Sequence, residues 1–166
     1  IVPNTLFSNH IIALDINPHS GQLNNPQKIW SAKPCVPVMT DDQWYGFSGR
    51  MAADANNIYM ITGATVADMY SHISLKDNNS SLMGELEDKF IGSMIKIDKN
   101  SNESEIFARG FRSPGGLFLD SSGSNIKIWA TDHGPRGGDE LNFILPGLDY
   151  GWPYVSMGEP YYWADE

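Results

Sequence analysis

Residues 130–142 carry the sequence Ala130-Thr131-Asp132-His133-Gly134-Pro135-Arg136-Gly137-Gly138-Asp139-Glu140-Leu141-Asn142 and follow an apolar run that ends at Trp129. Proline fixes φ and lacks a backbone donor, whereas glycine permits positive φ and close approach of the backbone. This cluster therefore predicts an irregular loop after a strand. Four side chains are candidate cation ligands, namely Asp132, His133, Asp139 and Glu140. With inward-turned carbonyls they suit a hard cation such as Ca²⁺, although a polar surface turn is the common structure for such clusters.

Two flanking segments complete a recognisable pattern. Upstream lies Gly110-Phe111-Arg112-Ser113-Pro114-Gly115-Gly116-Leu117, and downstream lies Asp149-Tyr150-Gly151-Trp152-Pro153. With the loop between them, they resemble the G-x-R-N-P-x-G-L, H/Q-G-P-x-x-G/D-D-E-L/I-N and N/D-Y-G-W-P segments of the soluble PQQ-dependent sugar dehydrogenases, the glucose/sorbosone dehydrogenase family. The resemblance covers residues 110–153 without a gap and is weaker over residues 1–109.

Composition bounds the class of protein. Of the 166 residues, 41% are hydrophobic and 19% are charged, and the formal net charge is −9. These values indicate a globular protein, and the acidic balance argues against binding nucleic acid or an anionic membrane surface. The single Cys35 excludes an internal disulfide and a cysteine-rich zinc site. No apolar run is long enough to span a membrane and no signal peptide is found; because Ile1 begins the chain, we expect a mature or excised piece.

Alternating apolar and turn residues predict four β-hairpins, at residues 9–32, 47–63, 91–109 and 116–130. A faint repeat links them, because residues 12–15 echo residues 95–98 and residues 49–54 echo residues 115–120. The predicted fold class is therefore all-β, a β-propeller of four-stranded antiparallel blades, with at most a short helix between residues 65 and 90. Residues 1–166 are expected to form one partial propeller domain.

Eight strands give about two blades, fewer than a closed propeller needs. The family resemblance implies a six-bladed propeller in a longer chain. Taken alone, these strands leave open blade edges and apolar blade faces, so we expect dependence on further sequence or self-association.

The resemblance also implies a chemistry. In the family, bound pyrroloquinoline quinone (PQQ) takes a hydride from the anomeric carbon of a sugar, and Ca²⁺ polarises the quinone before an electron acceptor is reduced. Arg112 matches the arginine that faces the cofactor, and Ser113 stands where the family has Asn. The backbone carbonyls of Gly134 and Pro135 match Ca²⁺ ligands. The alternative for Arg112 is a surface salt bridge.

A second, structural Ca²⁺ is implied by Glu140 and Tyr150, and the adjacent Asp139 is a further candidate ligand. The alternatives are a turn or capping role for the two carboxylates, and core packing for Tyr150 and Trp152. The resemblance further implies a periplasmic or secreted location.

The catalytic residue is unknown. In the family a histidine base precedes a G/S-G-R-L motif, which here is Ser48-Gly49-Arg50-Met51, and the histidine position falls on Gly46. Tyr45 is a poor base at neutral pH, and the nearest histidine is His72 in a long polar segment. Two functions remain open, a PQQ- and calcium-dependent sugar dehydrogenase acting on an aldose, and a catalytically inactive propeller that binds a sugar or a protein.

Overall fold

The computed structural model describes residues 6–7, 10–32, 36–37, 48–64, 90–123 and 125–159. The chain forms two compact units, Ile1–Asp42 and Gln43–Glu166. Within these described ranges the regular elements are all β-strands, and no helix is long and apolar enough to cross a membrane. The predicted short helix between residues 65 and 90 falls almost wholly outside them, as do Cys35, Tyr45, Gly46 and His72.

The first unit contains the predicted N-terminal hairpin. Strand β2 (His10–Ile16) pairs antiparallel with β3 (Leu23–Ser31), and the short strands β1 (Leu6–Phe7) and β4 (Val36–Pro37) pair with each other. The hairpin is confirmed, but its second strand begins earlier than the sequence indicated. The turn forms because the Asn17 side-chain oxygen accepts backbone N–H groups of the two residues that follow Pro18.

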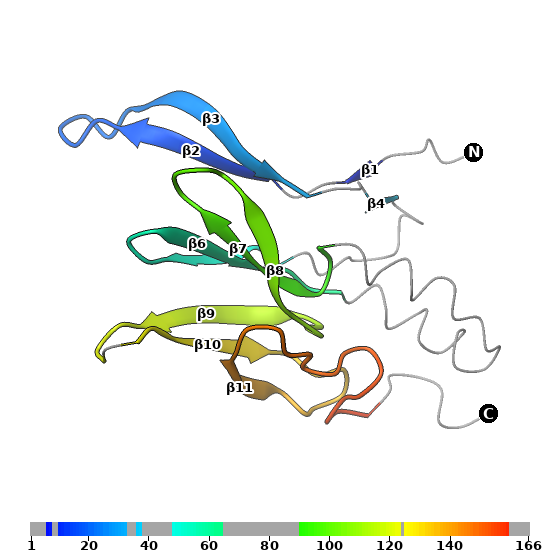
Figure 1. Cartoon of the computed structure of the whole chain (residues 1–166). Coiled ribbons are helices and arrows are strands. Elements are labelled where there is room, and N and C mark those ends of the chain that lie inside the picture. The colour runs from blue at the N-terminus through cyan, green and yellow to red at the C-terminus, as the bar shows by residue number, and fades with distance from the viewer. Residues whose placement is uncertain are drawn as a thin grey trace, which may run out of the picture. The chain divides into compact units, whose positions relative to one another are not determined.

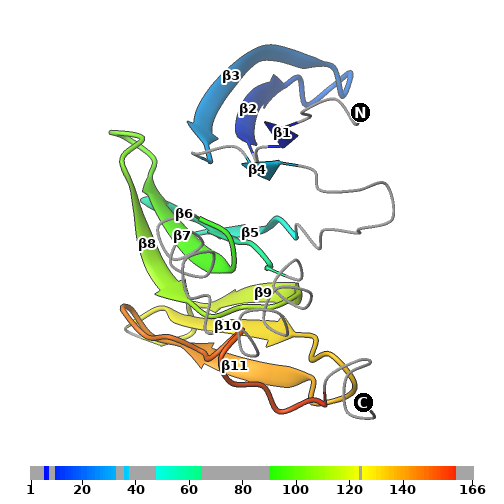
Figure 2. The same cartoon turned by 90° about the vertical axis from the view of Figure 1, so that its right-hand side faces the viewer.

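The second unit opens with a four-stranded antiparallel sheet in the order β5-β6-β7-β8 (Figures 1 and 2). Its strands are β5 (Arg50–Ala53), β6 (Asn57–Ile61), β7 (Ser93–Asp98) and β8 (Ser104–Arg109). The second and third predicted hairpins are thus confirmed, and β6–β7 pairing joins them into one blade. Turns close because Asp54 and Asp98 each accept backbone N–H groups two and three residues ahead.

A three-stranded antiparallel sheet follows, made of β9 (Pro114–Asp120), β10 (Lys127–Asp132) and β11 (Glu140–Ile144) in the order β11-β10-β9. The fourth hairpin is confirmed. The loop prediction was wrong beyond residue 139, because residues 140–144 form a strand that pairs with β10 over its whole length. The sequence did not indicate this short strand, because it begins directly after the Gly/Pro-rich loop.

The core of the second unit lies between the two sheets, which are adjacent in Figure 2. It is built from buried side chains of both: Tyr59, Ile61, Met94, Ala108, Phe111, Ile128, Ala130 and Ile144. The opposite face of β9–β11 is open, and its residues Phe118 and Leu141 are 63% and 67% exposed. This arrangement is a four-stranded blade packed on part of a second blade, with the apolar outer face that the sequence predicted.

Candidate functional site

A β-bulge at the end of β10 sets the geometry of the site. The β9–β10 register shifts between Thr131 and Asp132, so that Asp132 lies opposite Pro114. This places the buried Asp132 carboxylate beneath the turn at residues 112–113. Its Oδ2 accepts the backbone N–H of Arg112 at 2.8 Å, and its Oδ1 accepts that of Ser113 at 2.6 Å. One carboxylate thus holds both predicted cofactor-contacting residues.

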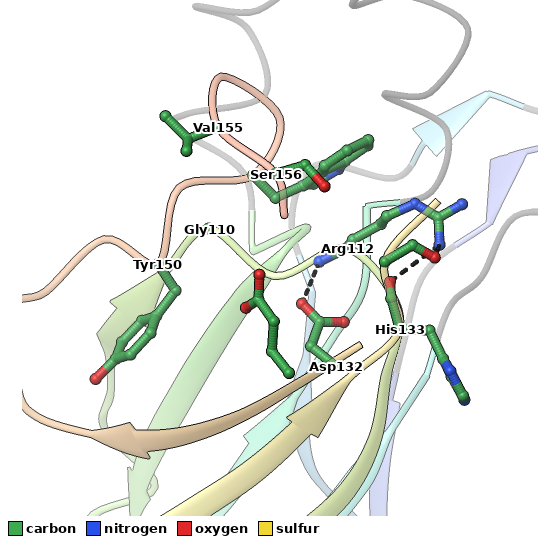
Figure 3. Close-up of a pocket in the computed structure, with 10 residues that line it drawn as sticks. Gly110, Arg112, Asp132, His133, Tyr150, Val155 and Ser156 are labelled. Atoms are coloured by element: carbon green, nitrogen blue, oxygen red, sulfur yellow. Dashed lines mark hydrogen bonds between the residues drawn. The ribbon is translucent and has the colours of Figure 1, made fainter. Parts of the chain in front are cut away.

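Arg112 then reaches back across the loop that follows Asp132. Its Nη1 donates to the carbonyl oxygens of His133 and Gly134, both at 3.0 Å (Figure 3). The guanidinium carbon also lies 5.4 Å from the ring centroid of Trp152, whose indole N–H donates to the Ala64 carbonyl at 3.0 Å. The arginine is 7% exposed, so these contacts fix a nearly buried cation at the loop.

The glycine-rich loop is closed by Asp139. Its Oδ1 accepts the Gly134 backbone N–H at 3.1 Å, and its Oδ2 lies 3.3 Å from His133 Nδ1. Gly134 is required by close approach, because a Cβ at this position would collide with the Gly137 carbonyl oxygen. Gly138 has φ +69° and lies against the backbone near Gly158, so two glycines permit a turn that larger residues would open.

The Asp132 carboxylate, buried below the loop, has charged neighbours and a shifted pKa. Burial raises the pKa of Asp132 above its ordinary value, a shift that the N–H bonds from Arg112 and Ser113 reduce and the nearby Glu140 carboxylate increases. Glu140 faces Asp132 across the β10–β11 ladder, and its Oε2 accepts the Asn142 side-chain N–H at 2.9 Å. Two carboxylates and one guanidinium therefore share a small, partly desolvated space.

Tyr150 has a mainly structural position. Its hydroxyl donates to the Phe143 carbonyl at 2.6 Å and accepts the Leu145 N–H at 2.9 Å. The ring stacks on Phe111, with centroids 5.1 Å apart and planes 19° apart. In Figure 3 the hydroxyl points away from Arg112. The packing role weighed for Tyr150 from the sequence thus describes its ring, and the residue also lines the pocket.

These elements surround one small pocket, drawn in Figure 3. Its lining residues are Gly110, Arg112, Asp132, His133, Gly134, Glu140, Tyr150, Trp152, Val155 and Ser156.

Of the predicted site residues, the structure therefore brings Arg112, Gly134, Glu140 and Tyr150 to one pocket. Ser113 is tied to its rim through Asp132, the buried Pro135 lies within the loop, and the exposed Asp139 caps it.

Asp132 lines the pocket, and sequence reasoning named it only as a candidate ligand. Its actual partners are backbone N–H groups twenty and nineteen residues away in sequence. Only the bulge reveals this pairing, and no motif indicated the bulge. The candidate base position, Gly46, lies outside the described residues.

To a Ca²⁺ ion, the described pocket residues could offer the Gly134 carbonyl and the Glu140 carboxylate, but no carboxylate cage. Within the described ranges, no group of three or more His, Cys, Asp or Glu side chains is arranged to hold a metal. The inward carbonyl of Gly134 accepts one hydrogen bond from Arg112 and retains a second lone pair, and Glu140 adds a carboxylate to the same pocket.

The pocket also has features suited to PQQ, an anionic tricarboxylate quinone. Arg112 supplies a permanent cation with a planar donor edge, and Trp152 supplies an aromatic surface beside it.

Comparison with known proteins identifies the family of the chain. The sequence model of the family described as Glucose / Sorbosone dehydrogenase matches residues 5–165. The aldose sugar dehydrogenase YliI of Escherichia coli (strain K12) is 30% identical over 128 residues, which cover 69% of this chain and 31% of that protein.

Solved structures share the fold. A glucose dehydrogenase superposes with a TM-score of 0.63 at 26% identity, over 92% of this chain and 43% of its own. The PQQ-bound aldose sugar dehydrogenase of Streptomyces coelicolor gives a TM-score of 0.56 at 19% identity, over 89% and 41%. The chain thus spans less than half the length of these proteins and forms part of a propeller. With its family match extending over nearly every residue, the chain belongs to the glucose/sorbosone dehydrogenase family.

Proposed function

We propose that this chain forms one wall of the PQQ and Ca²⁺ site of a sugar dehydrogenase that oxidises an aldose at its anomeric carbon. The observation that carries the proposal is the set of five hydrogen bonds that ties residues 112–113 to residues 132–134. These two segments are far apart in sequence, and each matches a cofactor-contacting motif of the family. A surface salt bridge or an ordinary turn would not need both to converge on a buried arginine.

In this proposal Arg112 binds the cofactor electrostatically, and its contact with Trp152 limits the directions in which the guanidinium can point. Ser113 would offer its hydroxyl where the family has an amide, so we expect a weaker polar contact there. PQQ, when bound, supplies the two-electron acceptor for the hydride of the sugar. The carbonyls of Gly134 and Pro135 would hold Ca²⁺ beside it.

A second Ca²⁺ would be held by Glu140 and Tyr150, both of which line the pocket. Asp139 is the weaker candidate, because both of its oxygens already contact the loop that it caps. Oxygen ligands should give a preference for Ca²⁺ over Zn²⁺.

The proposal is tested by titrating the chain with PQQ, with and without Ca²⁺, and by monitoring the absorbance of PQQ. Binding should require Ca²⁺ and should weaken at least about tenfold in Arg112→Gln, because a charge-assisted pair is lost. The matched control is Lys127→Gln, which removes a cation from the exposed start of β10. Equal affinity of the wild type and Arg112→Gln would contradict the assignment.

The second candidate is a catalytically inactive propeller that binds a sugar or a protein. Gly46 at the family's histidine position favours it, because no side chain there can accept the hydroxyl proton. A well-placed base contributes about 10²–10⁴-fold to such a step. We therefore expect the chain, given PQQ, Ca²⁺ and glucose, to reduce an acceptor dye no faster than background. Dye reduction by the unmodified chain would show that another base reaches the substrate.

Replacing the missing base provides a second test. Gly46→His in a full-length protein should raise turnover if the alignment at Gly46 is right. A periplasmic or secreted location is proposed on family resemblance, and fractionation of cells that express the natural gene would test it.

A further inference from the structure

We propose that Asp132 is the positioning residue for Arg112: its carboxylate sets the turn from which the guanidinium reaches the loop at residues 133–134. The inference rests on the proposed function of that loop, and it assigns to Asp132 a role distinct from metal binding. Asp132 would act through Arg112 and would not itself touch cofactor or sugar.

Burial makes the Asp132 carboxylate dependent on hydrogen bonds. Asp132 is 6% exposed, and a carboxylate at that depth is costly unless hydrogen bonds compensate it. Both oxygens are compensated by backbone donors, at 2.8 Å from Arg112 N and 2.6 Å from Ser113 N. Bonds of this kind are short and strong because the acceptor is charged. The carboxylate is therefore already engaged as an anion by the turn.

One short segment, residues 132–134, holds both ends of the arginine. Asp132 binds the backbone N–H of Arg112, and the next two residues of the same loop accept its Nη1 at 3.0 Å each. His133 in turn donates its backbone N–H to the Ser113 carbonyl at 3.2 Å. A shift of Asp132 would therefore move the arginine's backbone and its side-chain acceptors relative to each other.

A neutral amide at position 132 could not accept both backbone N–H groups. In Asp132→Asn the side-chain oxygen can accept one of the two N–H groups, but the amide nitrogen would place a donor against the other. One buried backbone donor would lose its partner, and the turn should open on that side. The guanidinium should then leave the ring of Trp152, which stays anchored through its own bond to Ala64.

The experiment compares wild type, Asp132→Asn and Asp120→Asn by nuclear magnetic resonance on the full chain. Asp120 is the matched control, since it caps Ser122 at the other end of the same two strands and is distant from the pocket. In Asp132→Asn the amides of residues 112 and 113 should exchange roughly tenfold faster or more, and contacts between Arg112 and Trp152 protons should disappear. The control should keep both signals.

The result that would overturn the inference is retention of the Arg112–Trp152 contact and of amide protection in Asp132→Asn. If Asp132→Asn does not fold, Asp132→Glu tests the same inference, because it keeps the charge but lengthens the side chain. The inference then requires weakened Arg112–Trp152 contacts in Asp132→Glu, and unchanged contacts would overturn it. Neither readout needs a cofactor.

A second arm uses PQQ with Ca²⁺ and distinguishes this inference from the proposed function. If wild type binds PQQ, Asp132→Asn should bind it about tenfold or more weakly, and unchanged affinity would overturn the functional part of the inference. If wild type does not bind PQQ, the proposed function fails, and the resonance data still decide whether Asp132 positions Arg112.

Discussion

Replacing Phe111 with alanine should remove a large share of the stability of the second unit. Phe111 is 0% exposed and packs in the core between the two sheets, one position before the arginine of the pocket. Its ring stacks on Tyr150, and its backbone N–H donates to the Gly92 carbonyl at 3.1 Å. The backbone bond survives the substitution, so the expected loss comes from the side chain alone.

The magnitude follows from transfer and cavity formation together. Withdrawing a fully buried phenylalanine side chain forfeits about 1.5–3 kcal/mol of hydrophobic free energy. The space left between two paired sheets can close only in part, which brings the expected loss to about 3–5 kcal/mol. Domains of this size have roughly 5–15 kcal/mol of unfolding free energy in total, so this loss is a substantial fraction of the stability.

Urea unfolding followed by tryptophan fluorescence measures this loss, at a protein concentration at which sedimentation shows a monomer. The matched control is Phe118→Ala on the open face of β9, where the side chain is 63% exposed. The control should change the unfolding free energy by no more than about 0.5 kcal/mol. A loss below about 1 kcal/mol for Phe111→Ala, or equal losses for the two variants, would refute the packing argument.

Three further outcomes are expected. Gly134→Ala should abolish Ca²⁺ binding in a calorimetric titration because the new Cβ meets a backbone oxygen of the loop. The control Gly123→Ala, where a Cβ has ample space, should bind Ca²⁺ as wild type does. Equal Ca²⁺ affinities of the two variants would contradict the loop geometry. Burial, followed by the Asp54 carboxylate, raises the pKa of Tyr59 to about 12. The stability that this shift provides below pH 10 should therefore be lost between pH 10 and about 12, and the loss should be smaller in Tyr59→Phe. Identical pH profiles of the urea midpoint for wild type and Tyr59→Phe would disprove this. Phe118→Asp should reduce any self-association seen by sedimentation, because that side chain lies on the open apolar face; unchanged association would place the contact elsewhere.

Much of the fold could be predicted from local pattern. Alternating residues such as those of β10 pack one face into the core, and turn residues such as Asp54 close hairpins through bonds to nearby backbone. These signals are local, so each hairpin was identified correctly. The pairing of β6 with β7 was not identified, because the segment between them is long and periodicity carries no information about which hairpins share a sheet.

The sequence indicated residues of the candidate site, but not the contacts that hold them in place. The motifs gave Arg112 and Gly134, and the structure brings them to one pocket. The bulge that turns Asp132 toward residues 112–113 depends on a register shift between strands, which no single segment specifies. The hydroxyl of Tyr150 likewise finds its partners at Phe143 in β11 and at Leu145 just after it, and the sequence did not indicate this strand.

The central claim is that the convergence of residues 110–113 with residues 132–140 creates a binding surface for PQQ and Ca²⁺. The most direct test is to add PQQ with Ca²⁺ to the isotopically labelled chain and to map the backbone amides whose resonances shift. The account predicts that the shifts concentrate in these two segments and at the indole N–H of Trp152, and that they weaken when Ca²⁺ is removed. Saturating PQQ and Ca²⁺ that leave these amides unchanged, or shifts confined to the β2–β3 hairpin, would contradict it.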